Sequence, residues 1–163
     1  MKVRGLFIDY GQLAARRELK AARQICTHYG IQIRELACSG CSDKTEGIVQ
    51  GRNAFLLYAA LMEFGKPSGI IALGVHAGTP YIDCSPEFIK AIQSTFDDYA
   101  NGRIRIGAPF VGWKKQDIWL YCQEMQVPVK LTYSCEKGCK PPCGRCLSCR
   151  DRKALHALPK HDD

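Results

Sequence analysis

The feature that most constrains this chain is a group of four cysteines near its C-terminal end. They follow the pattern Cys-x7-Cys-x2-Cys-x2-Cys, at Cys135, Cys143, Cys146 and Cys149. A tetrahedral Zn²⁺ ion is held by four such ligands at about 2.3 Å, and a Cys-x2-Cys pair supplies two of them from one tight turn. The spacing therefore predicts a zinc site closed by protein ligands alone, which is structural rather than catalytic.

The longer spacer leaves an alternative for the first ligand. Gly138, Pro141 and Pro142 interrupt regular structure there, so a loop can bring Cys135 back to the other three cysteines. Cys139 ranks second as that ligand because it would shorten the spacer to three residues. An Fe–S cluster uses the same four thiolates and remains a weaker alternative. Disulfides would need an oxidising compartment, and the chain shows no signal peptide.

Five of the other cysteines are scattered along the chain, at Cys26, Cys38, Cys41, Cys84 and Cys122. Cys26 and Cys122 lie in helical patterns and are predicted to be small buried apolar residues. Cys38 and Cys41 form a Cys-x2-Cys pair in a polar loop. Two ligands without further partners are weak grounds for a second metal or redox site, so the sequence assigns no role to this pair.

Length and composition place the chain among soluble proteins with a real core. Its 163 residues suit one domain with a small zinc appendage. No apolar run approaches the length of a membrane span, and ten cysteines without a secretion signal indicate the reducing cytoplasm. The formal net charge is +7, and a zinc ion with four thiolates would lower it to about +5. This charge suits a phosphate-bearing ligand or nucleic acid, or simply a solvated basic face.

Strands and helices are predicted to alternate along the chain. We expect strands over residues 3–9, 31–37, 69–75 and 103–106, and helices over residues 12–29, 52–64, 86–100 and 115–126. Residues 69–75 look like a buried strand, and Ser85 with Pro86 should begin the third helix. The alternation predicts an α/β domain over residues 1–130 with a parallel sheet, followed by a zinc segment with a C-terminal helix over residues 131–158.

Several segments, in a fixed order, match one protein family. They are FIDYGQ (7–12), GRNAFLL (51–57), YIDCSPEFIKAI (81–92), APFVGWKKQDIW (108–119) and VPVKLTYSCEKG (127–138), the last running into CGRCLSC. In this combination the chain resembles the 7-cyano-7-deazaguanine synthase family of the PP-loop ATP pyrophosphatase superfamily. The resemblance implies a doubly wound, Rossmann-like parallel sheet of the adenine nucleotide alpha hydrolase type.

The resemblance also implies chemistry, partners and site residues. The family converts 7-carboxy-7-deazaguanine and ammonia to the nitrile with ATP and Mg²⁺, in queuosine biosynthesis in the cytoplasm, and its members commonly pair as homodimers. Neither a membrane nor nucleic acid is expected as a partner. Residues predicted by resemblance to contact substrate or nucleotide are Gly51, Arg52, Asn53, Asp83 and Lys115. Purely structural interpretations also exist for two of these residues, since Asn53 could cap a helix and Lys115 could be a surface lysine.

One family motif is missing, and this leaves the catalytic residues unassigned. The Ser-Gly-Gly-x-Asp-Ser loop, whose backbone N–H groups hold phosphates, does not occur in the chain. The first strand here matches the family's second, so we expect a break in the sheet between residues 3–9 and 69–75. Three explanations are an N-terminal segment absent from this sequence, a partner chain that supplies the strand, and a degenerate relative that only binds.

Two functions of different classes therefore remain. The first is an ATP-dependent ligase that forms carbon–nitrogen bonds in the deazaguanine pathway. The alternative is a catalytically impaired, zinc-containing accessory protein that binds a nucleotide or nucleobase. A zinc-ribbon nucleic-acid module is disfavoured by the bulk of the α/β domain, and a related tRNA-modifying enzyme is disfavoured by the cysteine spacing.

Overall fold

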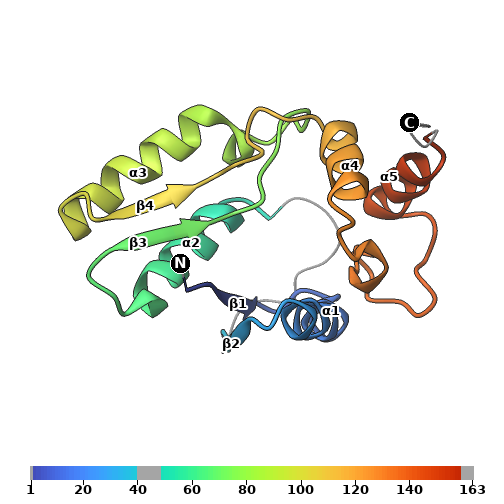
Figure 1. Cartoon of the computed structure of the whole chain (residues 1–163), viewed down its shortest axis with the longest axis horizontal. Coiled ribbons are helices and arrows are strands. Elements are labelled where there is room, and N and C mark those ends of the chain that lie inside the picture. The colour runs from blue at the N-terminus through green and yellow to red at the C-terminus, as the bar shows by residue number, and fades with distance from the viewer. Residues whose placement is uncertain (1, 40–48, 159–163) are drawn as a thin grey trace. The chain divides into compact units, whose positions relative to one another are not determined.

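The computed structural model describes residues 2–39 and 49–158 (Figure 1). The chain divides into two compact units, one formed by Met1–Ile48 with Gln126–Asp163 and the other by Val49–Met125. Each unit contains one pair of parallel strands together with helices. The predicted α/β class is therefore correct, with small parallel sheets. Cys41, one of the two cysteines of the predicted Cys38–Cys41 pair, lies outside the described residues.

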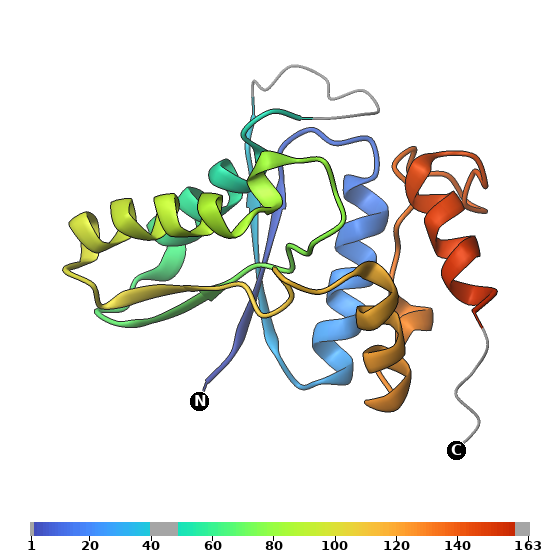
Figure 2. The ribbon, with the colours of Figure 1, turned by 90° about the horizontal axis from the view of Figure 1, so that it is seen from above.

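The first unit begins with a strand–helix–strand motif. Strand β1 (Arg4–Asp9), helix α1 (Ala15–His28) and strand β2 (Gln32–Ala37) follow one another, and β1 pairs with β2 in parallel from Arg4↔Gln32 to Asp9↔Ala37. Helix α1 contacts both strands (Figure 2). Gly5 permits this close packing, because a Cβ atom there would lie 2.8 Å from the sulfur of Cys26.

Helix α1 starts three residues later than the sequence predicts. The side chain of Gln12 is used in the preceding turn, where its Oε1 accepts from the backbone N of Tyr10 at 2.9 Å and its Nε2 donates to the carbonyl of Ile8 at 3.2 Å. Asp9 also accepts from the backbone N of Gly11 at 3.0 Å. These bonds hold residues 9–12 in a tight turn, so the helix begins only at Ala15.

The second unit contains helix α2 (Arg52–Phe64), strand β3 (Gly69–Ala72), a 3₁₀ turn η1 (Ile82–Cys84), helix α3 (Pro86–Ala100), strand β4 (Ile104–Gly107) and helix α4 (Lys115–Glu124). Strands β3 and β4 pair in parallel, from Gly69↔Ile104 to Ala72↔Gly107. The core of this unit is apolar and is built from Leu57, Ile71, Phe96, Ala100 and Ile104.

Strand β3 corrects the prediction of a fully buried strand over residues 69–75. It ends at Ala72, and its burial alternates, with Ile71 buried and Ile70 54% exposed. Alternation is the pattern of a strand with only one covered face. Strands β1 and β3 belong to different sheets, which agrees with the break expected between them. Helix α4 also ends early, because Gln126 has a positive φ of 52°.

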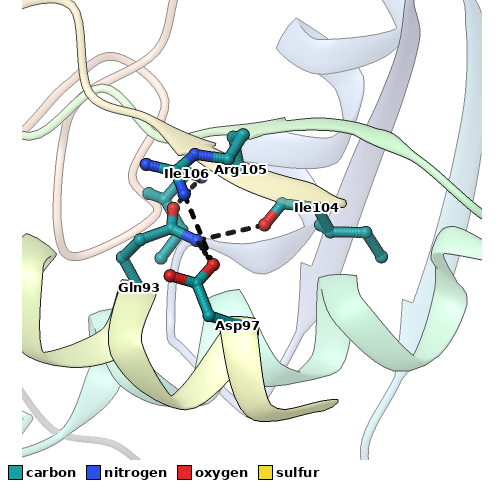
Figure 3. Close-up of polar contacts among 5 residues, drawn as sticks. All are labelled: Gln93, Asp97, Ile104, Arg105 and Ile106. Atoms are coloured by element: carbon teal, nitrogen blue, oxygen red, sulfur yellow. Dashed lines mark hydrogen bonds and ion pairs between the residues drawn. The ribbon is translucent and has the colours of Figure 1, made fainter. Parts of the chain in front are cut away.

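A glutamine side chain completes the outer edge of β4 (Figure 3). Gln93 on α3 donates to the carbonyl of Ile104 at 3.1 Å and accepts from the backbone N of Ile106 at 2.7 Å. The amide thus bonds the strand as a neighbouring peptide group would. Asp97 accepts from Gln93 at 2.6 Å and from Arg105 at 3.4 Å, which fixes the amide in place.

The start of α3 follows the prediction, and its contribution can be measured. Ser85 is the N-cap, its Oγ accepts from the backbone N of Phe88 at 3.1 Å, and Pro86 is the first helical residue. Ser85→Ala should lower the free energy of unfolding by about 1 kcal/mol, because one helix N–H loses its partner. Ser94→Ala, an exposed site on the same helix, should leave stability unchanged or slightly raised. Urea unfolding of both variants provides the measurement, and equal stabilities would contradict the capping role.

Candidate functional site

The four predicted metal ligands meet in the first unit. The thiols of Cys135, Cys143, Cys146 and Cys149 all lie within 4.8 Å of one another. Cys146 is the N-cap of helix α5 (Leu147–His156), and Cys149 lies in its first turn. Cys135 follows the 3₁₀ turn η2 (Val129–Leu131) and is 1% exposed. Two separate segments, brought together by folding, thus supply the cluster.

Backbone N–H groups point at two of these sulfurs. The backbone N of Cys143 donates to Sγ of Cys135 at 3.4 Å, and that of Cys146 donates to Sγ of Cys143 at 3.3 Å. Burial raises the pKa of Cys135, but surrounding N–H groups outweigh burial and bring it to about 6. Burial and the neighbouring thiols raise the pKa of Cys149 to about 12. Four crowded thiols cannot all ionise alone, and a divalent cation removes that obstacle.

The cluster fits a structural zinc ion. Bonds of about 2.3 Å to four sulfurs in a tetrahedron place those sulfurs about 3.8 Å apart, close to the observed limit of 4.8 Å. The donor set is complete without water, so the ion would brace the fold rather than activate a substrate. Cys139, the second-ranked alternative for Cys135, does not belong to the group of four. Its thiol instead donates to the carbonyl of Lys137 at 3.8 Å.

Polar side chains around the cysteine cluster bond the segment that contains Cys135 to helix α5. Glu136 accepts from both the backbone N and the hydroxyl of Ser148, at 2.9 and 2.7 Å, and so caps α5 from a distant position. Arg152 on α5 donates to the carbonyls of Thr132 and Val129, at 3.2 and 3.0 Å. These roles were not predicted from the sequence, although an acidic residue directly after Cys135 is a signal that could have indicated the contact of Glu136 with Ser148.

In the second unit, the structure brings together residues from two predicted ligand-contacting motifs. Gly51 is the N-cap of α2 with a left-handed φ of 73°, and Asn53, in the first turn, is only 4% exposed. The side-chain nitrogen of Asn53 donates to the carbonyl of Asp83 at 3.1 Å, and the backbone N of Asn53 lies 3.4 Å from the Asp83 carboxylate. Asn53 therefore fastens η1 to the start of α2 rather than capping the helix itself.

The neighbours of Asn53 complete a polar cluster that we call the Asn53 cluster: Arg52, Asn53, Asp83 and Cys84. The Nε of Arg52 donates to the side-chain oxygen of Asn53 at 3.3 Å. The thiol of Cys84 lies 3.7 Å from Nδ2 of Asn53 and 3.9 Å from the Asp83 carboxylate. Sequence reasoning treated Cys84 as one of the scattered cysteines. Its place directly after Asp83 was the signal for its membership.

Lys115, the last of the predicted site residues, belongs to another element of the same unit. It is the first residue of α4, whose first turn is held by Asp117, which accepts from the backbone N of Lys114 at 3.0 Å. The cluster therefore unites Arg52, Asn53 and Asp83 at the start of α2, while Lys115 stands at the start of α4. Both helix starts favour anionic groups.

Parallel strands joined through helices, together with a four-cysteine cluster that could hold a structural metal ion, define an α/β protein of this class. Sequence comparison assigns the family. A model of the family described as "Queuosine biosynthesis protein QueC" matches residues 41–158, more than half of the chain. The chain belongs to this QueC family.

Curated relatives cover nearly the whole chain. A protein of Aquifex aeolicus (strain VF5) is 34% identical over 182 aligned residues, which include 93% of this chain and 84% of that protein. One of Prochlorococcus marinus (strain NATL2A) is 33% identical, over 99% of this chain and 85% of its own length. One of Brucella canis is 31% identical, over 97% and 79%. All three are named 7-cyano-7-deazaguanine synthase.

No helix within the described ranges 2–39 and 49–158 combines the length and the apolar character that a membrane crossing requires. The longest helix of those ranges, α3, has 15 residues, fewer than the roughly 20 that span a bilayer.

Proposed function

We propose that this chain acts as a 7-cyano-7-deazaguanine synthase in queuosine biosynthesis. It would use ATP to convert 7-carboxy-7-deazaguanine and ammonia to the nitrile, in the cytoplasm, on a Rossmann-like sheet of the doubly wound type. The proposal rests on two findings together. Curated relatives that cover most of this chain are named for this activity, and the chain folds so that residues predicted to contact the ligand meet in the Asn53 cluster. That cluster joins two motifs thirty residues apart, both of which the resemblance had assigned to ligand contact.

The proposed reaction has two activations. Attack of the carboxylate on ATP forms an adenylate and releases pyrophosphate, and ammonia then displaces AMP to give an amide. The amide oxygen then attacks a second ATP and releases a second pyrophosphate, and this oxygen leaves as part of AMP while two protons are lost and the nitrile forms. Both steps need cationic groups near phosphate and a site closed to water. In this chain, Arg52 and Lys115 would supply positive charge, and both stand at helix starts.

Asp83 would serve as the acceptor for N–H groups of the deazapurine. Its carboxylate already faces the backbone N of Asn53 and the thiol of Cys84, and a carboxylate has lone pairs for further donors. Asn53, as a buried residue bonded to the backbone of Asp83, would position that carboxylate without touching the substrate. Gly51 gives the left-handed turn that starts α2 at this place.

Turnover by the purified full chain is the direct test of the proposed function. The protein, supplied with zinc, is incubated with 7-carboxy-7-deazaguanine, ammonium, ATP and Mg²⁺, and the nitrile is measured by mass spectrometry. We expect nitrile and AMP to appear together. Tight ATP binding without nitrile would favour the accessory binding protein, and neither binding nor turnover would contradict the proposal.

Asp83→Asn tests the role of the cluster within that reaction. We expect kcat/KM to fall by about 100-fold, because the lost charge and a small displacement of the substrate both raise the barrier. The unfolding midpoint should change little, since asparagine still offers an oxygen to the backbone N of Asn53. Asp98→Asn, an exposed residue on α3, removes the same charge outside the cluster and should keep full activity. Equal activity of the two variants would contradict the assignment.

A further inference from the structure

A concavity lies beside the cysteine cluster, apart from the residues of the proposed function. It has a volume of about 410 Å³ and is lined by residues of η2, of the segment 132–134, of the loop before α5 and of α5 itself, which contributes Cys149. All of these lie between residues 130 and 156, within the first unit. The cavity is therefore built by the same segment that the metal ligands hold together.

The lining of this cavity is strongly cationic. Lys130, Arg152 and Lys153 all contribute to it, and none of its lining residues is acidic. Both lysines are exposed, and neither forms an ion pair with any residue that the structure describes. Two unneutralised ammonium groups beside one guanidinium repel each other, and this arrangement is stabilised by an anion that contacts them all.

Arg152 is held as a fixed donor at this site. Its Nη1 donates to both oxygens of Thr132, at 3.2 and 3.0 Å, and its Nη2 donates to the carbonyl of Val129 at 3.0 Å. A guanidinium has five N–H groups, so at least two remain beyond these bonds. An arginine whose rotamer is already fixed loses little conformational entropy when it binds an anion.

A zinc ion bound by the four thiolates would neutralise part of this positive charge. A zinc ion with four thiolates carries a charge of −2, and one of its ligands, Cys149, lines the cavity. The three cations carry +3, so a positive excess remains at the mouth after the centre is balanced.

We propose that this cavity binds a small oligophosphate, such as pyrophosphate or the polyphosphate tail of a nucleotide. Planar guanidinium and flexible ammonium groups are the side chains that recognise phosphate oxygens. A volume of about 410 Å³ falls within the range of small-ligand pockets, roughly 300–1,000 Å³. Nucleic acid instead needs an extended basic stripe along its backbone, and this lining is confined to one cavity. The proposal does not depend on the proposed function.

Binding of pyrophosphate to the zinc-loaded full chain tests the site by isothermal titration calorimetry. We expect one pyrophosphate per chain with the affinity weakened by at least about tenfold in Lys130→Ala/Lys153→Ala, which removes two charge-assisted contacts. The control is Lys140→Ala/Arg150→Ala, two exposed cations of the same segment outside the cavity lining. It should bind within about twofold of the original chain. Zinc content of every variant is measured so that loss of the metal centre is recognised.

The outcomes separate the sources of the signal. Selective loss in Lys130→Ala/Lys153→Ala with zinc retained supports the site. No pyrophosphate binding by the original chain, or equal weakening in both double variants, overturns it. Anisotropy with a labelled 20-nucleotide single-stranded RNA forms the second arm. RNA binding that millimolar pyrophosphate does not displace, and that depends on Lys130 and Lys153, would assign these residues to nucleic acid and also overturn the proposal.

Discussion

Cys135→Ser should cost the protein its zinc and most of its C-terminal structure. Cys135 is 1% exposed and lies among the other three thiols. Serine does not ionise near neutral pH, so the ion would lose a quarter of its ligands and its charge balance. Structural zinc contributes on the order of 10 kcal/mol to folding, so the loss should exceed that of any single surface contact. Zinc content per chain and the unfolding midpoint are the measurements.

The matched control for this prediction is Cys139→Ser. Cys139 lies in the same loop and is the alternative fourth ligand from the sequence, but it stands outside the group of four. Its variant should keep one zinc ion per chain and a nearly unchanged midpoint. If Cys139→Ser lost its zinc and Cys135→Ser kept it, Cys139 would be the fourth ligand in place of Cys135. Zinc kept by both would show that the cluster tolerates either cysteine.

Phe96→Ala should destabilise the second unit by about 3–5 kcal/mol. Phe96 is fully buried, packs in the core with Leu57, and its ring lies 5.6 Å from that of Tyr58. Truncation removes the apolar area and leaves a cavity that the surrounding strands and helices fill only in part. Because whole domains are stable by only 5–15 kcal/mol, this change should lower the urea midpoint sharply.

Tyr99→Ala on the same helix supplies the comparison. Tyr99 is 73% exposed, so replacement removes an aromatic ring that contributes little to the core. We expect a change of less than about 0.5 kcal/mol for this surface site. If the two variants unfolded at the same urea concentration, α3 would not pack as the structure shows it.

Much of the local structure could be predicted because its signals are local. Helix α2 has the predicted bounds, and Ser85 with Pro86 begins α3 as expected. The grouping of the four cysteines was also predictable, because short cysteine spacings restrict the sulfurs to one turn. Where a single residue determines the local structure, as Pro86 does through its fixed backbone and Ser85 does through its hydroxyl, the sequence is enough for a correct prediction.

Other features depend on contacts between distant residues and were missed. The capping of α5 by Glu136 and the tie between Asn53 and Asp83 join residues twelve and thirty positions apart. The exposed face of β3 likewise depends on which elements cover it, not on its apolar run of residues. Periodicity reports how a segment is patterned, whereas these contacts are settled only when the segments meet.

The amide of Gln93 determines which edge of the β3–β4 sheet can pair with a further strand. A two-stranded sheet has two edges at which a further strand could hydrogen-bond, and open edges recruit other chains. Gln93 occupies the outer hydrogen-bonding groups of β4 at Ile104 and Ile106. Any strand that extends this sheet must therefore add beside β3, whether it comes from the same polypeptide or from another one. The two edges of this sheet therefore differ. The edge at β4 has hydrogen-bonding groups already used by Gln93, and the edge at β3 is the one where a further strand could pair.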